Sequence, residues 1–198
     1  MKLISILRGI FLTLILSFSF STYAALDKLT EVTGFGSNPG SLRMFKYVPA
    51  NVNTPAAMIV PLHGCTQDAE RYNDENGWTD LADRYGFIVM MPQTNTVNQP
   101  RGCFTWYEPS DFDRGQGEAL SIVNMVSKMK QDHQIDDSKV FLSGLSAGGC
   151  MAANLLASYP DFFKGASVQA ASNYRSATNL TQGMAIYDGT FYDKTPQE

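Results

Sequence analysis

A serine framed by glycines constrains the fold of this 198-residue chain more than any other feature of its sequence. The run Gly144-Leu145-Ser146-Ala147-Gly148-Gly149 follows a short apolar segment, Val140–Leu142, and opens a segment rich in small residues, Ala147–Ser158. A chain that turns directly from a strand into a helix has room only for small residues two positions before and two positions after the central one. The pattern therefore predicts that Ser146 projects from a strand–turn–helix at the carboxyl edge of a parallel sheet.

Apolar segments of two kinds alternate along the rest of the chain. Helical spacing is found from Trp78 to Tyr85, ended by Gly86, and again from Ala119 to Met129. Short β-rich runs indicate strands, and these are Leu42–Val48, Met58–Leu62, Phe87–Met91, Val140–Leu142 and Ala166–Ala170. Alternation of this kind is typical of an α/β fold, a mostly parallel sheet with helices on both faces.

The ends of this pattern carry two further expectations. Pro92 should close the strand that begins at Phe87, because proline interrupts a hydrogen-bonded ladder. After Asn173 the pattern fades into polar residues, and no further strand or helix is predicted. The long polar stretch from Gln93 to about Gly115 exceeds an ordinary connection, which makes it a candidate functional loop.

The first residues are predicted to be a secretory signal peptide, residues 1–24. Lys2 and Arg8 precede an apolar run, Ile10–Phe20, and Thr22-Tyr23-Ala24 forms a small-residue cleavage site. The alternative is a membrane anchor, but the run is shorter than the about 20 residues a span needs. We therefore expect a secreted protein, extracellular or periplasmic, with one domain over residues 25–198 and no membrane association after cleavage. Its compartment would permit disulfides.

Composition excludes several classes of function. The net charge of −4, without a block of basic residues, argues against a nucleic-acid partner. Three cysteines are too few for a disulfide-built scaffold, and two histidines are too few for most histidine-rich metal sites. The run Asp111-Phe112-Asp113-Arg114 is interpreted as a solvated loop, so we expect neither a metal nor a cofactor.

Two segments define the candidate catalytic chemistry. Ser146 is the candidate nucleophile, although it could also be a simple helix N-cap. His63-Gly64-Cys65 follows the apolar strand Met58–Leu62. Hydrolases whose nucleophilic serine lies on a strand–turn–helix have their oxyanion loop in this place. The backbone amides of Cys65 and Ala147 would then stabilise the oxyanion. We expect His63 and Gly64 to support that loop, with His63 held by a hydrogen bond rather than acting as a general base.

The second histidine, His133, follows the helix that contains Val126. This position predicts that His133 lies at the amino-terminal edge of the sheet, opposite the edge that carries Ser146. A histidine at the end of a helix complements the negative, carbonyl end of the helix dipole. Neither histidine is therefore expected to serve Ser146 as a base.

The resemblance to a known family rests on five segments in order: Pro61–Asp68, Gly77–Pro92, Gly102–Tyr107, Arg114–Ile122 and Ile135–Gly149. Together they resemble the polyhydroxybutyrate-depolymerase-type esterases, α/β-hydrolases that are similar to feruloyl and acetylxylan esterases. The resemblance implies that Ser146 is the nucleophile and that His63-Gly64-Cys65 is the oxyanion loop. It also implies a triad Asp and His after the serine, but no histidine follows His133.

Asp188 and Asp193 are weak candidates for the triad acid and are better interpreted as polar turn residues near Gly189. We therefore expect an incomplete hydrolase domain whose last strands, triad Asp and triad His are missing. As it stands, such a chain should be a poor esterase.

Side chains on two loops complete the prediction. Cys65 and Cys103 belong to loops at the same sheet edge and are expected to form a disulfide, the alternative being free thiols, while Cys150 should face the interior or a partner segment. Trp106 and Tyr107, with Phe104, could form an apolar wall for substrate or simply pack the loop.

The resulting expectation is a carboxylic ester hydrolase that uses a serine nucleophile and an acyl-enzyme. Its substrate would be an ester polymer or small ester: polyhydroxyalkanoate, a feruloylated or acetylated polysaccharide, or a short-chain ester. The alternatives are a non-catalytic secreted binding domain of the same fold and a secreted serine peptidase.

Overall fold

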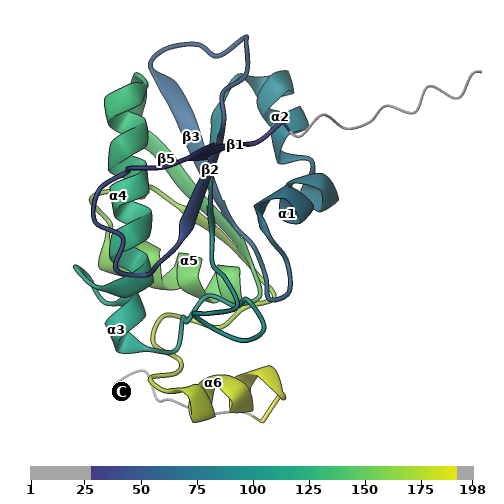
Figure 1. Ribbon diagram of the computed structural model, residues 1–198, viewed down its shortest axis with the longest axis vertical. Helices are drawn as coiled ribbons and strands as arrows, with labels where there is room; N and C mark the ends of the chain where they lie inside the picture. The colour runs from purple at the N-terminus through teal and green to yellow at the C-terminus, as the bar shows by residue number, and fades with distance from the viewer. Residues whose placement is uncertain (1–27, 191–198) are drawn as a thin grey trace, which may run out of the picture.

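The computed structural model describes residues 28–190, which form a six-stranded sheet flanked by helices (Figure 1). The predicted signal peptide, residues 1–24, lies outside the described residues. The sheet has the order β1-β2-β4-β3-β5-β6. Its strands are β1 Thr30–Val32, β2 Arg43–Tyr47, β3 Ala56–Leu62, β4 Ile88–Gln93, β5 Ile135–Leu145 and β6 Ala166–Gln169. The last four pair in parallel, whereas β1 and β2 add an antiparallel edge.

Helices lie on both sides of this sheet, and α4 and α5 are on the side opposite α1 and α2 (Figure 1). The helices are α1 Ala69–Asn76, α2 Trp78–Tyr85, α3 Pro109–Phe112, α4 Gly117–Asp132, α5 Ala147–Ser158 and α6 Leu180–Tyr187. None of these described helices is both long and apolar enough to cross a membrane. Together with the parallel strands, they confirm the predicted α/β fold.

The strand β4 shows why the central strands are apolar throughout. Ile88 and Met90 belong to the core cluster that includes residues of α4 and α5. Val89 and Met91 belong to a second cluster formed with residues of α1 and α2. Because successive side chains of a strand point to opposite faces, burial on both faces requires a continuous apolar run.

Two expectations about element boundaries are wrong. The strand β4 continues through Pro92 to Gln93, with Pro92 opposite Met44 of β2. Within the described sheet its pairing with β3 covers only Ile88 and Val89, so Pro92 lies where a residue without an N–H is tolerated. The polar segment after Asn173 also contains a helix, α6, capped by the Asn179 side chain.

Three short elements gave no usable signal in the sequence. The strand β1 has three residues, the helix α3 has four, and α1 (AERYNDEN) is mostly polar. The helix α1 has no apolar stripe that would predict it. Its start is stabilised by the Asp68 side chain, which accepts a hydrogen bond from the Arg71 amide.

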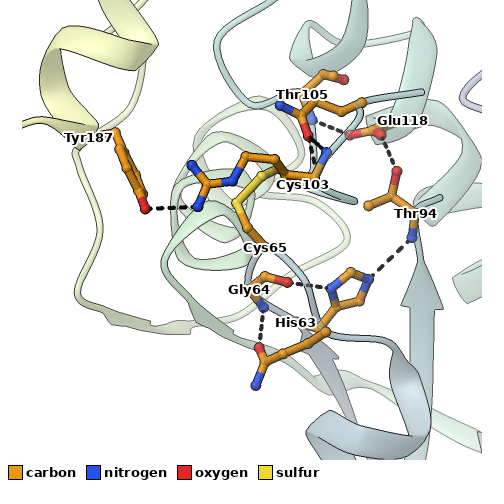
Figure 2. Close-up of a disulfide and its surroundings, with 11 residues drawn as sticks. His63, Gly64, Cys65, Thr94, Cys103, Thr105, Glu118 and Tyr187 are labelled. Atoms are coloured by element: carbon orange, nitrogen blue, oxygen red, sulfur yellow. Dashed lines mark hydrogen bonds between the residues drawn. A yellow bond between two sulfur atoms is a disulfide. The ribbon is translucent and has the colours of Figure 1, made fainter. Parts of the chain in front are cut away.

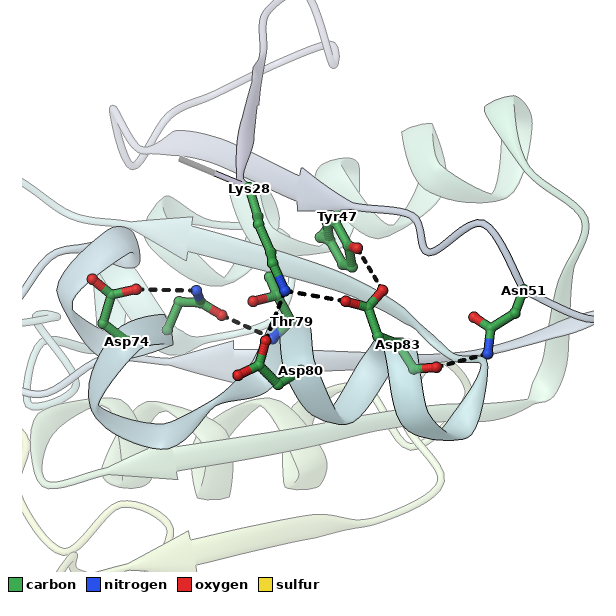
Figure 3. Close-up of polar contacts among 8 residues, drawn as sticks. Lys28, Tyr47, Asn51, Asp74, Thr79, Asp80 and Asp83 are labelled. Atoms are coloured by element: carbon green, nitrogen blue, oxygen red, sulfur yellow. Dashed lines mark hydrogen bonds and ion pairs between the residues drawn. The ribbon is translucent and has the colours of Figure 1, made fainter. Parts of the chain in front are cut away.

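Lys28, the first described residue, forms ion pairs with residues of α2 that lie more than 50 positions further along the chain (Figure 3). The Lys28 ammonium lies 2.7 Å from the Asp80 carboxylate and 3.1 Å from that of Asp83. These carboxylates raise the pKa of Lys28, and the Tyr47 hydroxyl also donates to Asp83. Because the pairs are exposed, they add little stability, but they fix the antiparallel edge of the sheet against α2.

Candidate active site

Ser146 occupies the turn between β5 and α5, as the sequence predicts. Its backbone has φ 56° and ψ −121°, a conformation that side-chain-bearing residues rarely adopt. The turn is held on both sides, because the Ser146 amide donates to the Gln169 carbonyl and its own carbonyl accepts from the Cys150 amide, both at 2.9 Å. Ser146 stands at the N-cap position of α5, but its side chain makes no capping hydrogen bond.

The glycines of the turn allow three backbone segments to touch. A Cβ atom on Gly148 would lie 2.2 Å from the Leu62 carbonyl oxygen, and one on Gly144 would lie 2.2 Å from the Gly148 carbonyl oxygen. Both distances are far below van der Waals contact. The end of β3 therefore packs directly on the start of α5. As a result Gly64 lies beside the serine, where its own Cβ would be 3.6 Å from that of Ser146.

The loop after β3 holds its amides in fixed directions. The Gly64 amide donates to the Gln67 side-chain oxygen, and the Thr66 amide donates to the Arg101 carbonyl, both at 2.8 Å. The Cys65 amide lies between these two anchored neighbours. Ala147 is the first residue of α5, where backbone N–H groups and the helix dipole favour negative charge.

His63 is buried beside this loop, and both of its ring nitrogens are engaged (Figure 2). Nδ1 lies 2.7 Å from the Gly64 carbonyl, which can only accept, so Nδ1 carries the proton. Nε2 lies 3.3 Å from the Thr94 amide, which can only donate, so Nε2 is the acceptor. These contacts fix a neutral tautomer, and burial lowers the pKa of His63 further. No lone pair remains free to accept a proton from Ser146.

A buried carboxylate that the sequence analysis missed supports the same region. Glu118 of α4 is 1% exposed and accepts hydrogen bonds from the Thr105 amide at 2.8 Å and the Thr94 hydroxyl at 3.1 Å (Figure 2). Burial raises the pKa of Glu118 to about 7, with a further contribution from the nearby Asp111 charge, and the Thr105 bond opposes the rise. Helical spacing could have found it, because Glu118 shares the buried face of α4 with Ile122.

The disulfide between Cys65 and Cys103 confirms the predicted pairing (Figure 2). The two Cα atoms are 4.2 Å apart although 38 positions separate them in the sequence. The bond ties the long loop after β4 to the loop after β3. Cys150 is a free, buried thiol that accepts a hydrogen bond from the Ser172 amide, and burial raises its pKa to about 11.

A cavity of about 410 Å³ opens beside Ser146, within the usual range for small-molecule sites. It is lined by Cys65, Gln99, Arg101, Cys103, Trp106, Tyr107, Ser146, Ala147, Cys150, Ala170, Ala171, Ser172, Gly183, Met184, Ile186 and Tyr187. Trp106 and Tyr107 are on its wall, with their rings edge to face at 5.6 Å. Phe104 is instead buried against the His63 ring, at 4.8 Å.

The helix α6 closes one side of this cavity. Gly183 packs on the Tyr107 ring so closely that a Cβ there would be 2.8 Å from a ring carbon. On the same helix, the Tyr187 hydroxyl accepts a hydrogen bond of 2.9 Å from Arg101 of the long loop (Figure 2). The sequence gives no signal for the contacts of Arg101 and α6, because these contacts join segments more than 70 residues apart.

The remaining sequence candidates lie elsewhere. His133 ends α4 just before β5 begins, and Ser146 follows the other end of that strand. Ile135 and Gly144 of β5 pair with Ala56 and Leu62 of β3, so about 20 Å of sheet lies between the two ends. It contacts Lys46, at 3.2 Å, and burial lowers its pKa. Asp188 ends α6 and is not among the residues that line the cavity. Asp193 lies outside the described residues.

The interpretation of Asp111-Phe112-Asp113-Arg114 as a solvated loop is wrong for its first half, because Asp111 and Phe112 belong to the helix α3. Phe112 is fully buried, while Asp113 pairs with Arg175 and Arg114 pairs with Asp161. Within residues 28–190, no cluster of three or more histidines, cysteines or acidic residues could hold a metal ion.

A mostly parallel sheet with a strained serine at its carboxyl edge, between a strand and a helix, defines an α/β-hydrolase. The chain belongs to the esterase PHB depolymerase family, whose model matches residues 43–190. It is 46% identical over 178 residues to poly(3-hydroxyalkanoate) depolymerase C of Paucimonas lemoignei. This match covers 90% of this chain and 42% of that protein. Feruloyl esterase B of Thermothelomyces thermophilus is 35% identical over 177 residues, covering 86% of this chain and 59% of that protein.

Among solved structures, the acetyl xylan esterase from Aspergillus awamori superimposes with a TM-score of 0.76 at 29% identity. That match covers 84% of this chain and 62% of the esterase chain. The chain thus spans about half the length of the curated relatives it matches.

Proposed function

We propose that this chain is a secreted carboxylic ester hydrolase domain in which Ser146 is the nucleophile. The observation that carries the proposal is the strained serine on the wall of the cavity. Its hydroxyl makes no capping bond, and the cavity is also lined by Cys65 and Ala147. Strained backbone of this kind persists where the surrounding structure over-determines it, which is typical of functional turns.

The proposed chemistry proceeds in two steps. A general base takes the proton of the Ser146 hydroxyl as its oxygen attacks the ester carbonyl, and the resulting oxyanion is held by the amides of Cys65 and Ala147. The protonated base then gives this proton to the leaving oxygen, so that collapse of the intermediate expels the alcohol and leaves an acyl-enzyme. Water, deprotonated by the same base, hydrolyses the acyl-enzyme to the acid and frees Ser146. A preorganised amide donor typically contributes about 3 kcal/mol to such a transition state. His63 and Gly64 keep the Cys65 amide in place.

A general base is the part of this mechanism that the described residues do not supply. His63 is locked as a neutral donor–acceptor pair, and His133 lies at the other end of β5. With the residues of the described part alone, hydrolysis should therefore be slow, with about 10³–10⁴-fold acceleration over water when a triad member is lacking. The same observation favours the second candidate function, a secreted binding domain that holds esters without cleaving them.

The proposed substrate class follows from the relatives and the cavity. Relatives that resemble this chain are named for poly(3-hydroxyalkanoate), feruloyl and acetylxylan esters. The apolar wall formed by Trp106, Tyr107 and Met184 suits an acyl or aromatic group. Secretion is supported by the signal-peptide pattern of residues 1–24 and by the disulfide, which is typical of oxidising compartments.

The test supplies the missing base from solution. Hydrolysis of p-nitrophenyl butyrate is measured with and without imidazole, and the rate of imidazole alone is subtracted. We expect imidazole to accelerate the protein-dependent rate in the native sequence and in the control Ser172→Ala, which alters another serine of the cavity wall. Ser146→Ala should lose this acceleration. Equal acceleration in the Ser146 variant would contradict the nucleophile assignment.

Trapping the intermediate distinguishes the hydrolase from the binding domain. A fluorophosphonate probe is added with imidazole, and the labelled peptide is identified by mass spectrometry. We expect the label on Ser146 in the native sequence and in Ser172→Ala. Binding of esters without labelling at Ser146 would favour the non-catalytic alternative.

A further inference from the structure

Among residues 28–190, the cavity beside Ser146 is lined by a single charged residue, Arg101. All other lining residues are apolar or neutral. No aspartate or glutamate forms an ion pair with Arg101 in the described part of the chain, in contrast to Arg43, Arg71 and Arg114. A cation that pairs with no carboxylate of the described residues, at the wall of a cavity that they line with no other charge, is a candidate anion-binding group.

The backbone and the side chain of Arg101 are both held in place. Its carbonyl accepts a hydrogen bond from the Thr66 amide at 2.8 Å, and its own amide donates to the Gln99 side chain at 2.6 Å. The disulfide at Cys103 fixes the loop two residues further on. The guanidinium carbon lies 4.9 Å from the centroid of the Tyr187 ring, and one Nη donates to the Tyr187 hydroxyl.

This arrangement leaves most donors of the guanidinium for a ligand. A guanidinium has five N–H donors, and the bond to Tyr187 uses one of them. The planar fork matches a carboxylate, which can accept two parallel hydrogen bonds. An acetyl ester of a sugar has no carboxylate, whereas an oligomer of a hydroxyacid has one at its end.

We propose that Arg101 binds the terminal carboxylate of a hydroxyacid oligomer whose ester bond lies at Ser146. The inference rests on the proposed function for the place of the ester, and it selects hydroxyacid esters over acetylated and feruloylated sugars. Arg101 acts here as a specificity-determining residue. The carboxylate is a feature of the substrate and takes no part in bond cleavage.

The test measures binding, so it does not depend on turnover. In a Ser146→Ala background at pH 7.5, tryptophan fluorescence is titrated with the linear trimer of 3-hydroxybutyrate and with its methyl ester. Trp106 lines the cavity and reports occupancy. We expect the acid to bind about fivefold more tightly than the methyl ester, since a partly exposed ion pair contributes up to about 1 kcal/mol. The preference should shrink in 0.5 M KCl.

Three substitutions in that background isolate the charge. Arg101→Gln should abolish the preference for the acid, and Arg101→Lys should retain part of it. Arg84→Gln is the matched control, because Arg84 also stacks on a tyrosine, 5.3 Å from the Tyr85 centroid, but lies outside the cavity. It should leave the preference unchanged.

Equal affinities for acid and ester, an unchanged preference in Arg101→Gln, or no saturable binding of either compound would overturn the inference. Its failure is distinguishable from failure of the proposed function. A preference for the acid without labelling of Ser146 would contradict only the catalytic assignment. Labelling of Ser146 without that preference would contradict only the role of Arg101.

Discussion

Replacing Glu118 by glutamine should change how the stability of this protein depends on pH. The buried carboxylic acid has a pKa of about 7, against 4.5 for an exposed glutamate. Because the folded-state pKa is raised, the protonated acid stabilises the fold fully below pH 4.5. That contribution is lost as the pH rises to about 7. A difference of 2.5 in pKa corresponds to about 3 kcal/mol of unfolding free energy.

Glutamine is nearly isosteric with the protonated acid and can keep both contacts. Its oxygen can accept from the Thr105 amide, and its NH₂ group can donate to the Thr94 hydroxyl. Glu118→Gln should therefore match the native stability near pH 4.5 and exceed it by about 3 kcal/mol at pH 8. The buried His63 titrates in both proteins, so its contribution cancels in the difference.

The assay is urea unfolding monitored by tryptophan fluorescence at intervals between pH 4.5 and 8.5. Glu108→Gln is the control, because Glu108 is near Glu118 in the sequence but only partly buried. It should follow the native curve across this range. Parallel curves for native protein and Glu118→Gln would refute the reasoning, because they would mean that Glu118 titrates alike in the folded and unfolded states.

Two further substitutions probe the framework of the site. Replacing Cys65 and Cys103 together by serine should lower the unfolding free energy by about 4 kcal/mol, since the disulfide closes a loop of 38 positions. Equal urea midpoints for the native protein and this variant, measured without reductant, would contradict the expected loss. Gly148→Ala should destabilise by about 3 kcal/mol, because its Cβ would lie 2.2 Å from the Leu62 carbonyl oxygen. Gly165→Ala is the control, because a Cβ there would meet only the Phe141 ring, at 3.5 Å. It should lower the free energy of unfolding by less than about 1 kcal/mol. Similar losses of unfolding free energy in both variants would contradict the packing argument.

The local patterns of the chain were enough to predict its main elements. The apolar runs of β3 and β4, the helical spacing of α4 and the glycines around Ser146 each depend on residues close together in the sequence. The helix α5 has the bounds that the sequence predicts. Its start is fixed because a strand that turns sharply into a helix leaves little freedom in where the helix begins. The pairing of Cys65 with Cys103 was also predictable, since strand order places both loops at one edge.

Only the tertiary structure decided what surrounds the serine. The neutral tautomer of His63 depends on the Thr94 amide, 31 positions away. The pKa of Glu118 depends on its burial and on its hydrogen bonds to the long loop after β4. The helix α6 lacks a strong apolar stripe and is positioned by Gly183 against Tyr107. Contacts of this kind join distant segments, and their energies come from burial and hydrogen-bond direction. Residue type and spacing determine which segments fold into strands and helices, whereas packing decides which side chains meet.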